Sequence, residues 1–192
     1  MAIELVIHGR GGHGRVVADA WQGPHRFTDQ RDGTCPGPRD VCWFVAIGDN
    51  KTRRQLAARF QRNCACPPAT VIHALAQVSE GATIASGVYV GPMAVVNAGA
   101  SVWADCIINT GAIVEHDCYV AEASHISPGA VLCGGAKISE GCWIGANAVV
   151  KEGVSIAPWT VVGCGAVVVH DIAKPGTYVG VPVRKLKQAV SA

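Results

Sequence analysis

Residues 111–138 read GAIVEHDCYVAEASHISPGAVLCGGAKI, and a branched aliphatic residue recurs in this stretch at every sixth position. The same spacing continues in both directions, from Ile72 to Val168, without any insertion or deletion. The residues on this period are Ile72, Val78, Ile84, Val90, Val96, Val102, Ile108, Val114, Val120, Ile126, Leu132, Ile138, Ile144, Val150, Ile156, Val162 and Val168. Chance agreement over so many steps is negligible, so the period reflects the fold.

The positions beside the aliphatic residues are patterned as well. A small residue such as Ala112, Cys118 or Ala130 lies two positions earlier, and glycine is frequent one position before that. A period of six fits neither a helix nor a simple strand, whereas hexapeptide repeats are typical of a β-helix built of short strands and tight turns. We expect the aliphatic side chains to fill the interior, and the glycines to adopt turn dihedrals that a Cβ makes costly.

The composition excludes several classes of function. The 192 residues carry a formal net charge of +2, too small an excess to indicate a nucleic-acid partner. No apolar run reaches the roughly 18 residues of a membrane span, and the N-terminus lacks a signal-peptide pattern. Three of the nine cysteines occupy the small inward slots of the repeat, where cysteine acts as a compact hydrophobe. A reduced, cytoplasmic protein without membrane insertion is therefore predicted.

The first 65 residues or so have a different pattern. Residues 3–7 predict a short buried strand, residues 9–14 read GRGGHG, and Arg15 to Trp21 have helical character. A strand, a glycine-rich turn and a helix are the layout in which backbone N–H groups cradle phosphate, and Asp29 is placed to bind a ribose. A complete dinucleotide fold needs two mononucleotide halves, so this segment predicts a half-Rossmann α/β domain.

A second strand is predicted over residues 42–47, followed by a helix from Lys51 to Gln61 that Asp49 or Asn50 caps. We divide the chain into a small α/β domain over residues 1–66, a β-helix over 67–172 and a C-terminal extension over 173–192.

Ionisable residues are sparse within the repeats, which draws attention to His116, its neighbour Asp117, and His125. A carboxylate beside a histidine orients the imidazole and favours its protonated form, which suits general-base catalysis. The two histidines are nine residues apart, half of an 18-residue coil, so they should lie on different faces of one chain. They can approach each other only across a subunit interface, which predicts an active site between protomers of a cyclic oligomer.

The other candidate sites are weaker. His13, in the glycine-rich turn, could contact a nucleotide or serve the turn alone, and His73 is interpreted as structural. Cys64 and Cys66 have no second pair of cysteines that could complete a zinc site. No spacing brings a third histidine to His116 and His125 either, so no metal site is predicted. Cys118 falls in an inward slot, where packing explains it better than nucleophilic catalysis.

Taken together, these segments resemble the hexapeptide-repeat sugar acetyltransferases of the sialic acid O-acetyltransferase type, which include N-acetyltransferases acting on UDP-4-amino-4,6-dideoxy sugars. The matching segments are residues 9–14 (GRGGHG), 46–50 (AIGDN), 109–118 (NTGAIVEHDC), 124–126 (SHI) and 180–182 (GVP). The likeness covers nearly the whole chain, and its motifs are specific in combination.

The resemblance implies a left-handed parallel β-helix, an exception to the right-handed crossover rule, assembled as a homotrimer. It also implies a nucleotide-sugar in the N-terminal domain and acetyl-CoA between neighbouring β-helices. His116 would be the general base, with its basicity increased by Asp117. The residues that would contact acetyl-CoA are His125, Gly134, Ala146 and Cys164. Those that would contact the nucleotide-sugar are Asp29, Gly48 and Asp49, and further Gly12, His13 and Arg53.

The implied reaction is a direct attack of a sugar amine on the thioester carbonyl, with His116 removing the proton. Within the family, O-acetylation of sialic acid or another sugar hydroxyl is the alternative. Two alternatives come from other classes. A nicotinamide-dependent oxidoreductase fits the glycine motif but lacks the second mononucleotide half, and a non-catalytic solenoid scaffold leaves the His116–Asp117 pair without a role.

Overall fold

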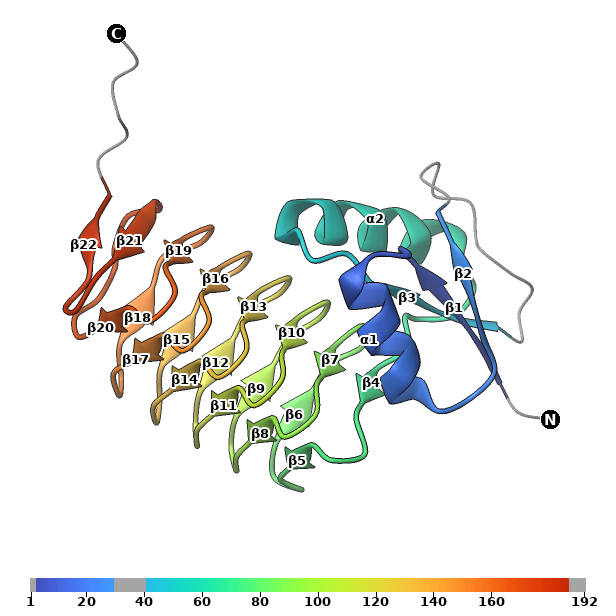
Figure 1. The fold of residues 1–192 in the computed structure, drawn as a ribbon, viewed down its shortest axis with the longest axis horizontal. Helices are drawn as coiled ribbons and strands as arrows, with labels where there is room; N and C mark the ends of the chain where they lie inside the picture. Colours follow the sequence, from blue (N-terminus) through green and yellow to red (C-terminus); the bar gives the residue numbers. More distant parts are fainter. Residues whose placement is uncertain (1–2, 30–40, 187–192) are drawn as a thin grey trace, which may run out of the picture.

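The structure is a computed structural model that describes residues 3–29 and 41–186. A small α/β part leads into a long column of very short strands, and the α/β part lies against one end of that column (Figure 1). The column is a three-sided parallel β-helix, as the six-residue period predicts.

The strands of the column have two residues each and recur every six residues. They are β4 (Val71–Ile72), β5 (Gln77–Val78), β6 (Thr83–Ile84), β7 (Tyr89–Val90), β8 (Val95–Val96), β9 (Ser101–Val102), β10 (Ile107–Ile108), β11 (Ile113–Val114), β12 (Tyr119–Val120), β13 (His125–Ile126), β14 (Val131–Leu132), β15 (Lys137–Ile138), β16 (Trp143–Ile144), β17 (Val149–Val150), β18 (Ser155–Ile156), β19 (Val161–Val162) and β20 (Val167–Val168).

Successive strands belong to different sheets, and each strand pairs in parallel with the strand three places further on. Ile107, for example, lies opposite His125, and Ile108 opposite Ile126. One coil is therefore 18 residues, or three hexapeptides. An eight-stranded sheet contains β4, β7, β10, β13, β16 and β19, a six-stranded sheet runs from β5 to β20, and a five-stranded sheet runs from β6 to β18.

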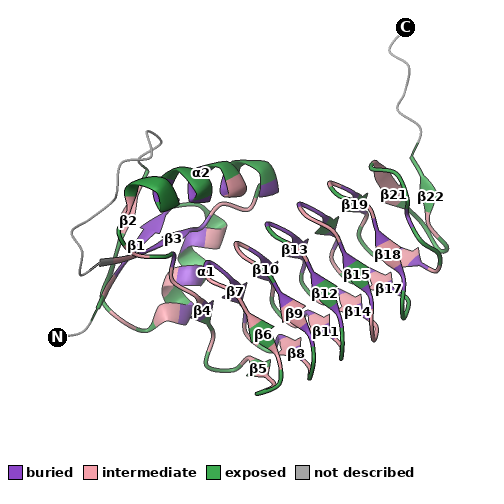
Figure 2. Ribbon diagram, turned by 180° about the vertical axis from the view of Figure 1, so that it is seen from behind, coloured by how far each residue is buried: buried purple, intermediate pink, exposed green. Residues whose placement is uncertain are grey.

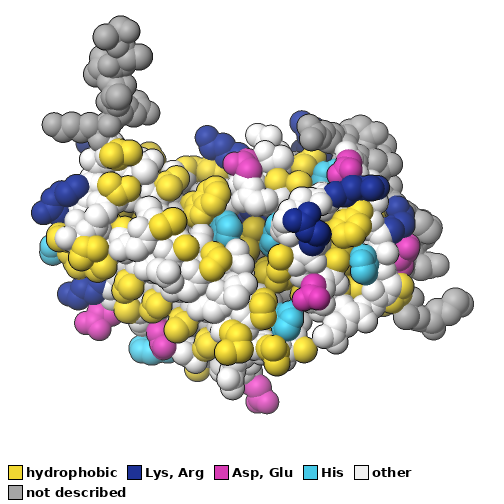
Figure 3. Space-filling view, viewed as in Figure 1, with side chains coloured by type: hydrophobic (Ala, Val, Ile, Leu, Met, Phe, Trp, Pro, Cys, Tyr) yellow, Lys and Arg dark blue, Asp and Glu magenta, His cyan; other side chains and the backbone are white. Residues whose placement is uncertain are grey.

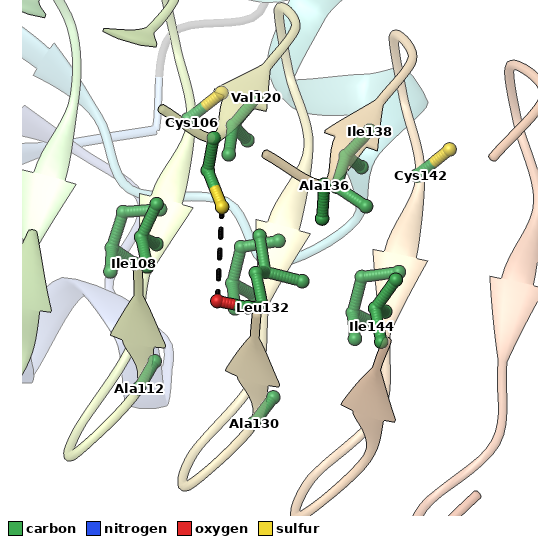
Figure 4. Close-up of a cluster of buried hydrophobic side chains, with 14 of the residues drawn as sticks. Cys106, Ile108, Ala112, Val120, Ala130, Leu132, Ala136, Ile138, Cys142 and Ile144 are labelled. Atoms are coloured by element: carbon green, nitrogen blue, oxygen red, sulfur yellow. Dashed lines mark hydrogen bonds between the residues drawn. The ribbon is translucent and has the colours of Figure 1, made fainter. Parts of the chain in front are cut away.

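The second residue of each strand points into the column and is almost always buried. Figure 4 shows these side chains, such as Ile108, Leu132 and Ile138, together with the small residues that fill the space beside them. Cys106, Cys118 and Cys142 are among the small ones, and all three are buried, as predicted. Burying each aliphatic side chain contributes about 1.5–3 kcal/mol, so the repeated core is the main source of stability. Figure 2 shows buried residues recurring along the column.

From Gly87 to Gly165, one position in every turn has a positive φ, again with a period of six. These residues are Gly87, Met93, Gly99, Asp105, Gly111, Asp117, Ala123, Gly129, Gly135, Gly141, Asn147, Gly153, Trp159 and Gly165. Most are glycine, aspartate or asparagine, the residues that adopt left-handed backbone most readily. The predicted turn role of the glycines is therefore confirmed, and Asp117 has a place in the turn as well as a candidate place in the chemistry.

The ends of the column depart from the prediction. Ile72 was expected to fill the interior, but its side chain is 43% exposed. The reason is that β4 is the edge strand of its sheet, so no coil lies beyond it. At the other end, β21 (Thr177–Val179) pairs with β19 and with β22 (Arg184–Lys185). The C-terminal extension therefore lengthens the eight-stranded sheet; its residues 187–192 lie outside the described part.

The α/β part contains the two predicted strands and two predicted helices with slightly shifted bounds, and one further strand, β2. β1 (Glu4–His8) is the central strand of a parallel sheet between β2 (His25–Thr28) and β3 (Val41–Val45). α1 (Gly12–Trp21) follows β1, and α2 (Asn50–Asn63) follows β3. Asp49 is the N-cap of α2, because its carboxylate accepts a hydrogen bond from the backbone N–H of Thr52 at 2.8 Å.

An apolar cluster joins the α/β part to the column. Leu5 and Val17 of the α/β part share one core with Val71, Tyr89 and Ile107, which project outward from the eight-stranded sheet. This sheet therefore has its first strands covered by the α/β part and its later strands open.

Arg53 adds a polar joint beside this core, although it is only 1% exposed. Its guanidinium donates to the carbonyl oxygens of Ile47 and Gly48 in the α/β part and of Asp105 and Ala123 in the column, at 2.7–3.0 Å. Burial lowers the pKa of Arg53 to about 10, so it remains a cation at neutral pH. One buried side chain thus satisfies backbone acceptors on both sides of the junction.

Replacing Arg53 should therefore loosen this junction. We expect Arg53→Met to lower the free energy of unfolding by about 3 kcal/mol or more, because several buried carbonyl groups lose their partner. The matched control is Arg54→Met on the same helix. Arg54 is partly exposed and pairs with Glu122 and Glu140, so its loss should cost about 1 kcal/mol or less. Equal losses for the two variants in urea unfolding would contradict the assigned role.

Candidate active site

His116 and Asp117 lie in the turn after β11, at the corner where the six-stranded sheet gives way to the five-stranded sheet. His116 Nδ1 is 2.9 Å from Asp117 Oδ2, and both side chains are well exposed, at 66% and 73%. The predicted pair therefore exists as a hydrogen-bonded dyad. Nε2 of His116 is left to face a reactant.

The surroundings make His116 more basic than an ordinary histidine. The hydrogen bond with Asp117 raises its pKa, and the negative charges of Asp117 and Glu115 raise it further. Glu115 is itself held in place, since Asn97 Nδ2 donates to its Oε2 at 2.9 Å. The dyad therefore has the electrostatics of a general base.

Two glycines of neighbouring coils leave room for the dyad. A Cβ on Gly134 would lie 2.6 Å from His116 Nε2, and a Cβ on Gly99 would lie 2.5 Å from Asp117 Oδ1. Gly134 was predicted to contact acetyl-CoA; in the structure it lies directly beside the imidazole.

His125 is on the eight-stranded sheet, in β13, where it follows Ile107 in the outward row. It is only 8% exposed and is stacked on Trp143, with ring centroids 5.2 Å apart. Burial lowers its pKa to about 3, and the nearby Arg53 and His13 contribute. His125 therefore stays neutral where His116 titrates.

The two histidines lie apart within one chain. A corner between the six- and five-stranded sheets is opposite the eight-stranded face of a three-sided column, and His125 belongs to that face. The α/β part covers the same face, so His116 is on the far side of its own column from the α/β part.

Ala146 and Cys164 form a second group. They follow β16 and β19, one coil apart, and the backbone N–H beyond Cys164, that of Gly165, donates to the Ala146 carbonyl oxygen at 2.8 Å. Both lie at the corner between the eight- and six-stranded sheets. Of the four predicted cofactor residues, His125, Ala146 and Cys164 border the same face, whereas Gly134 accompanies His116.

Four of the predicted substrate residues line one cleft of about 520 Å³. Gly12, His13, Asp29 and Gly48 all contribute to it, at the ends of β1, β2 and β3. Carboxyl ends of parallel strands are where α/β sheets bind ligands. A neighbouring cleft of about 420 Å³ shares Asp29 and Ile47 with the first, and α2 contributes Thr52 and Gln55 to it.

The local sequence explains this cleft. Gly11 is the N-cap of α1, so the first N–H groups of the helix face the opening. The third glycine of the motif, Gly14, allows close packing, since a Cβ there would collide with the Gly9 carbonyl oxygen. His13 is partly buried, and burial together with Arg53 lowers its pKa to about 4, so it is neutral.

Two predicted substrate residues lie elsewhere. Arg53 uses its guanidinium on backbone carbonyl groups inside the protein, which leaves no exposed donor for a ligand. The contacts at the domain junction explain why an arginine occupies this position, which the sequence motif linked to the substrate. Asp49 caps α2 and borders a third cleft of about 260 Å³, which Trp143, Trp159 and Lys51 also line.

Two residues beside His125 were not among the candidates. Asn109 forms a side-chain hydrogen bond with it, and Trp143 stacks on it from the next coil. Trp143 could have been found from the 18-residue spacing. Over residues 3–29 and 41–186, no group of three His, Cys, Asp or Glu side chains is placed to hold a metal ion. No helix in the same ranges is long and apolar enough to cross a membrane.

Residues 135–170 match the family model described as bacterial transferase hexapeptide (six repeats). No curated protein sequence matches the chain.

Several solved structures match over almost their full length. The acetyltransferase domain of PglB from Neisseria gonorrhoeae shows 34% identity and a TM-score of 0.86, covering 95% of this chain and 99% of that one. The same domain in complex with acetyl coenzyme A shows 33% identity and a TM-score of 0.88, covering 95% and 98%. PerB from Caulobacter crescentus, in complex with CoA and GDP-perosamine, shows 32% identity and a TM-score of 0.85, covering 96% and 97%.

About a third of the residues are thus identical over nearly the whole length of these proteins. The chain belongs to the hexapeptide-repeat sugar acetyltransferases.

Proposed function

We propose that this protein transfers the acetyl group of acetyl-CoA to the amine of a nucleotide-activated amino sugar, such as a UDP-4-amino-4,6-dideoxy sugar. The observation that carries the proposal is the His116–Asp117 dyad, an exposed imidazole with a raised pKa and an open Nε2. The similar structures support it, since one holds acetyl coenzyme A and another holds CoA with GDP-perosamine.

The nucleotide part of the acceptor would occupy the cleft of Gly12, His13, Asp29 and Gly48. The N-terminus of α1 directs backbone N–H groups at it, which suits a diphosphate, and Asp29 suits a ribose hydroxyl. The parallel order β2-β1-β3 with a glycine-rich first turn supports the interpretation of this part as half of a Rossmann fold. Asp49 would contribute indirectly, because its capping hydrogen bond holds the start of α2 beside Gly48.

The acyl donor would bind along the corner that carries Ala146 and Cys164. Its reactive end would lie near His125 and would also contact Gly134 of another chain. Such contacts would be made largely by backbone, as the small side chains in these turns leave the peptide groups accessible.

A complete site would then need two chains, because His116 is opposite the face that carries the α/β part. The outer row of the six-stranded sheet offers a surface for assembly: Val95, Ile113, Val131, Val149 and Val167 form an apolar row that is only partly covered. Figure 3 shows few charged side chains over the middle of the column. A cyclic trimer of left-handed columns, as in the family, would cover this row and bring His116 of one chain to the cleft of the next.

The chemistry follows from these positions. The amine nitrogen attacks the carbonyl carbon of the thioester, and His116 Nε2 takes the proton that the nitrogen loses. The carbon–sulfur bond then breaks, and the proton ends on the thiol of CoA. Asp117 stabilises the imidazolium that forms in between. General-base help contributes about 10²–10⁴-fold, and holding both substrates together supplies the rest.

The direct test is a transfer assay with acetyl-CoA and a panel of acceptors, comprising UDP- and GDP-linked 4-amino sugars and sialic acid. Thiol release and mass spectrometry of the sugar report the product. We expect acetylation of an amine on a nucleotide-linked sugar, and His116→Ala should lower turnover by about 10²–10⁴-fold with nearly unchanged affinity for acetyl-CoA. The exposed His170 provides the control substitution, His170→Ala. Acetylation of hydroxyl groups alone would select the O-transfer alternative, and full activity of His116→Ala would remove the base assignment.

The pH dependence of turnover should report the dyad. A base works in its neutral form, so turnover falls as the pH falls through the raised pKa of His116, above the ordinary value of about 6.5. Asp117→Asn removes the carboxylate, so this limb should move to lower pH, and turnover on the plateau should fall because the base is weaker. Profiles of kcat/KM for both proteins, with Glu80→Gln as a control for charge removal, would measure it. A limb that stays in place in Asp117→Asn contradicts the dyad.

The space beside His116 yields a separate prediction. Gly134→Ala places a methyl group 2.6 Å from Nε2 and must displace the imidazole, so turnover should fall by about tenfold or more while the fold persists. Gly81→Ala is the matched control, because its Cβ meets nothing closer than 3.8 Å. If the two alanine variants have equal turnover, His116 does not need its present position.

A further inference from the structure

The five-stranded sheet carries two large aromatic side chains on its outer surface. Tyr119 is the outward residue of β12, and Trp103 follows β9 in the coil before it. Their ring centroids are 6.0 Å apart and the ring planes are inclined at 51°, so the two rings form one surface. Trp103 is 44% exposed and Tyr119 is 42% exposed, so much of their apolar area stays in contact with water.

The repeat itself does not require aromatic residues at these two places. Small residues occupy the equivalent positions of other coils: Thr83, Ser101 and Ser155 in the row of Tyr119, and Ala85, Ala121 and Ala157 in the row of Trp103. The strands form equally well with side chains of this size. Packing within the column therefore gives no reason for an indole and a phenol, which leaves a contact outside the column as the reason.

The tryptophans of this protein differ in how they use the indole N–H. Four of them donate it to a protein acceptor at 2.8–3.2 Å, namely Trp21, Trp43, Trp143 and Trp159. Trp103 makes no such hydrogen bond within the part of the chain that the structure describes. Its N–H group can therefore donate to a ligand without breaking a contact of the protein.

The aromatic pair lies beside the candidate base. Tyr119 is three residues after His116, so their Cα atoms are at most about 11 Å apart. The Asp117 carboxylate lies next to Gly99, in the coil that carries Trp103. A reactant held at His116 therefore lies within reach of this surface.

The two sheets that meet at His116 differ in the surface that they offer. The outward row of the six-stranded sheet is aliphatic, which suits packing against another column. Apart from Trp103 and Tyr119, the five-stranded sheet presents small or polar residues and Lys137. Such a surface suits a carbohydrate. The C–H groups on one side of a sugar ring pack on the negative face of an aromatic ring, and the sugar hydroxyl groups can bond to its polar N–H or O–H group.

We propose that Trp103 and Tyr119 contact the sugar ring of the acceptor while its amine faces His116, which makes them specificity-determining residues. In the proposed function, on which this inference rests, the nucleotide occupies the α/β cleft of another chain. Only the sugar then reaches the column, so the aromatic pair recognises the sugar and not the nucleotide.

Two substitutions test this separation of sugar from nucleotide. Trp103→Ala and Tyr119→Thr introduce residues that the same rows carry in other coils, so both variants should fold. Each should raise the KM for the nucleotide-linked acceptor by about three- to tenfold, because one aromatic contact is lost. The inhibition constant of the free nucleoside diphosphate and the KM for acetyl-CoA should stay unchanged. The control is Ile3→Ala, which removes apolar surface that is 55% exposed at the amino end of β1 and should change none of these constants.

Three results would overturn the proposal. The first is an unchanged KM for the acceptor in both variants, and the second is an equal weakening of the free nucleoside diphosphate. The third is a loss of the wild-type oligomer in sedimentation, which would make the pair an interface between chains. The pH limb assigned to His116 should keep its position, since neither substitution changes a charge.

Binding without transfer decides the same question independently of the reaction. A nucleotide-linked amino sugar should change the tryptophan fluorescence of the wild-type protein more than that of Trp103→Ala, whereas UDP or GDP alone should act equally on both. Equal responses to the nucleotide-linked sugar, or no response at all, overturn the inference. A wild-type protein that binds the sugar but acetylates none of the acceptors would contradict the proposed function alone.

Discussion

The structure depends on the requirement that one residue in six must be buried inside the column and another must accept a positive φ. Between Val90 and Val168 the inward residue is apolar and enclosed in every turn, and from Gly87 to Gly165 the positive φ recurs without a gap. These two positions carry the fold together with the small buried residue between them, so the other three of each hexapeptide are free to vary. Asp117 can belong both to the dyad and to the turn, because aspartate is among the few residues with a side chain that tolerate a positive φ.

Because the coils are stacked, residues that are far apart in the sequence become neighbours in space. Residues 18 apart lie one above the other, as His125 and Trp143 do, and residues 16 apart meet at a coil edge, as Asn109 and His125 do. Residues nine apart, such as His116 and His125, are placed on different sides. In a single chain the candidate residues therefore lie on different sides of the column, and the α/β part is close to only one of these sides. This geometry is the physical argument for a site shared by two chains.

The sequence period was sufficient to predict the coils, the inward residues and the separation of the two histidines, because all of these depend on phase alone. It failed at Ile72, since exposure there depends on where the stack ends. It did not predict that Arg53, whose motif suggested a ligand contact, joins the α/β part to the column. An arginine in the first turn of α2, just after Gly48, is compatible with a substrate contact or with a buried junction. Only the packing of α2 against the column decides between them. The Asn109–His125 contact required side-chain orientations that no spacing contains.

The two histidines show how one side chain acquires opposite properties on the same scaffold. His116 is at an exposed corner beside a carboxylate, which favours its charged form. His125 is buried on the eight-stranded face, near Arg53, stacked on Trp143 and hydrogen-bonded to Asn109, where a charge is disfavoured. A base must change its protonation state during each turnover. Exposure at the corner gives His116 the freedom to do so, whereas burial on the face keeps His125 neutral.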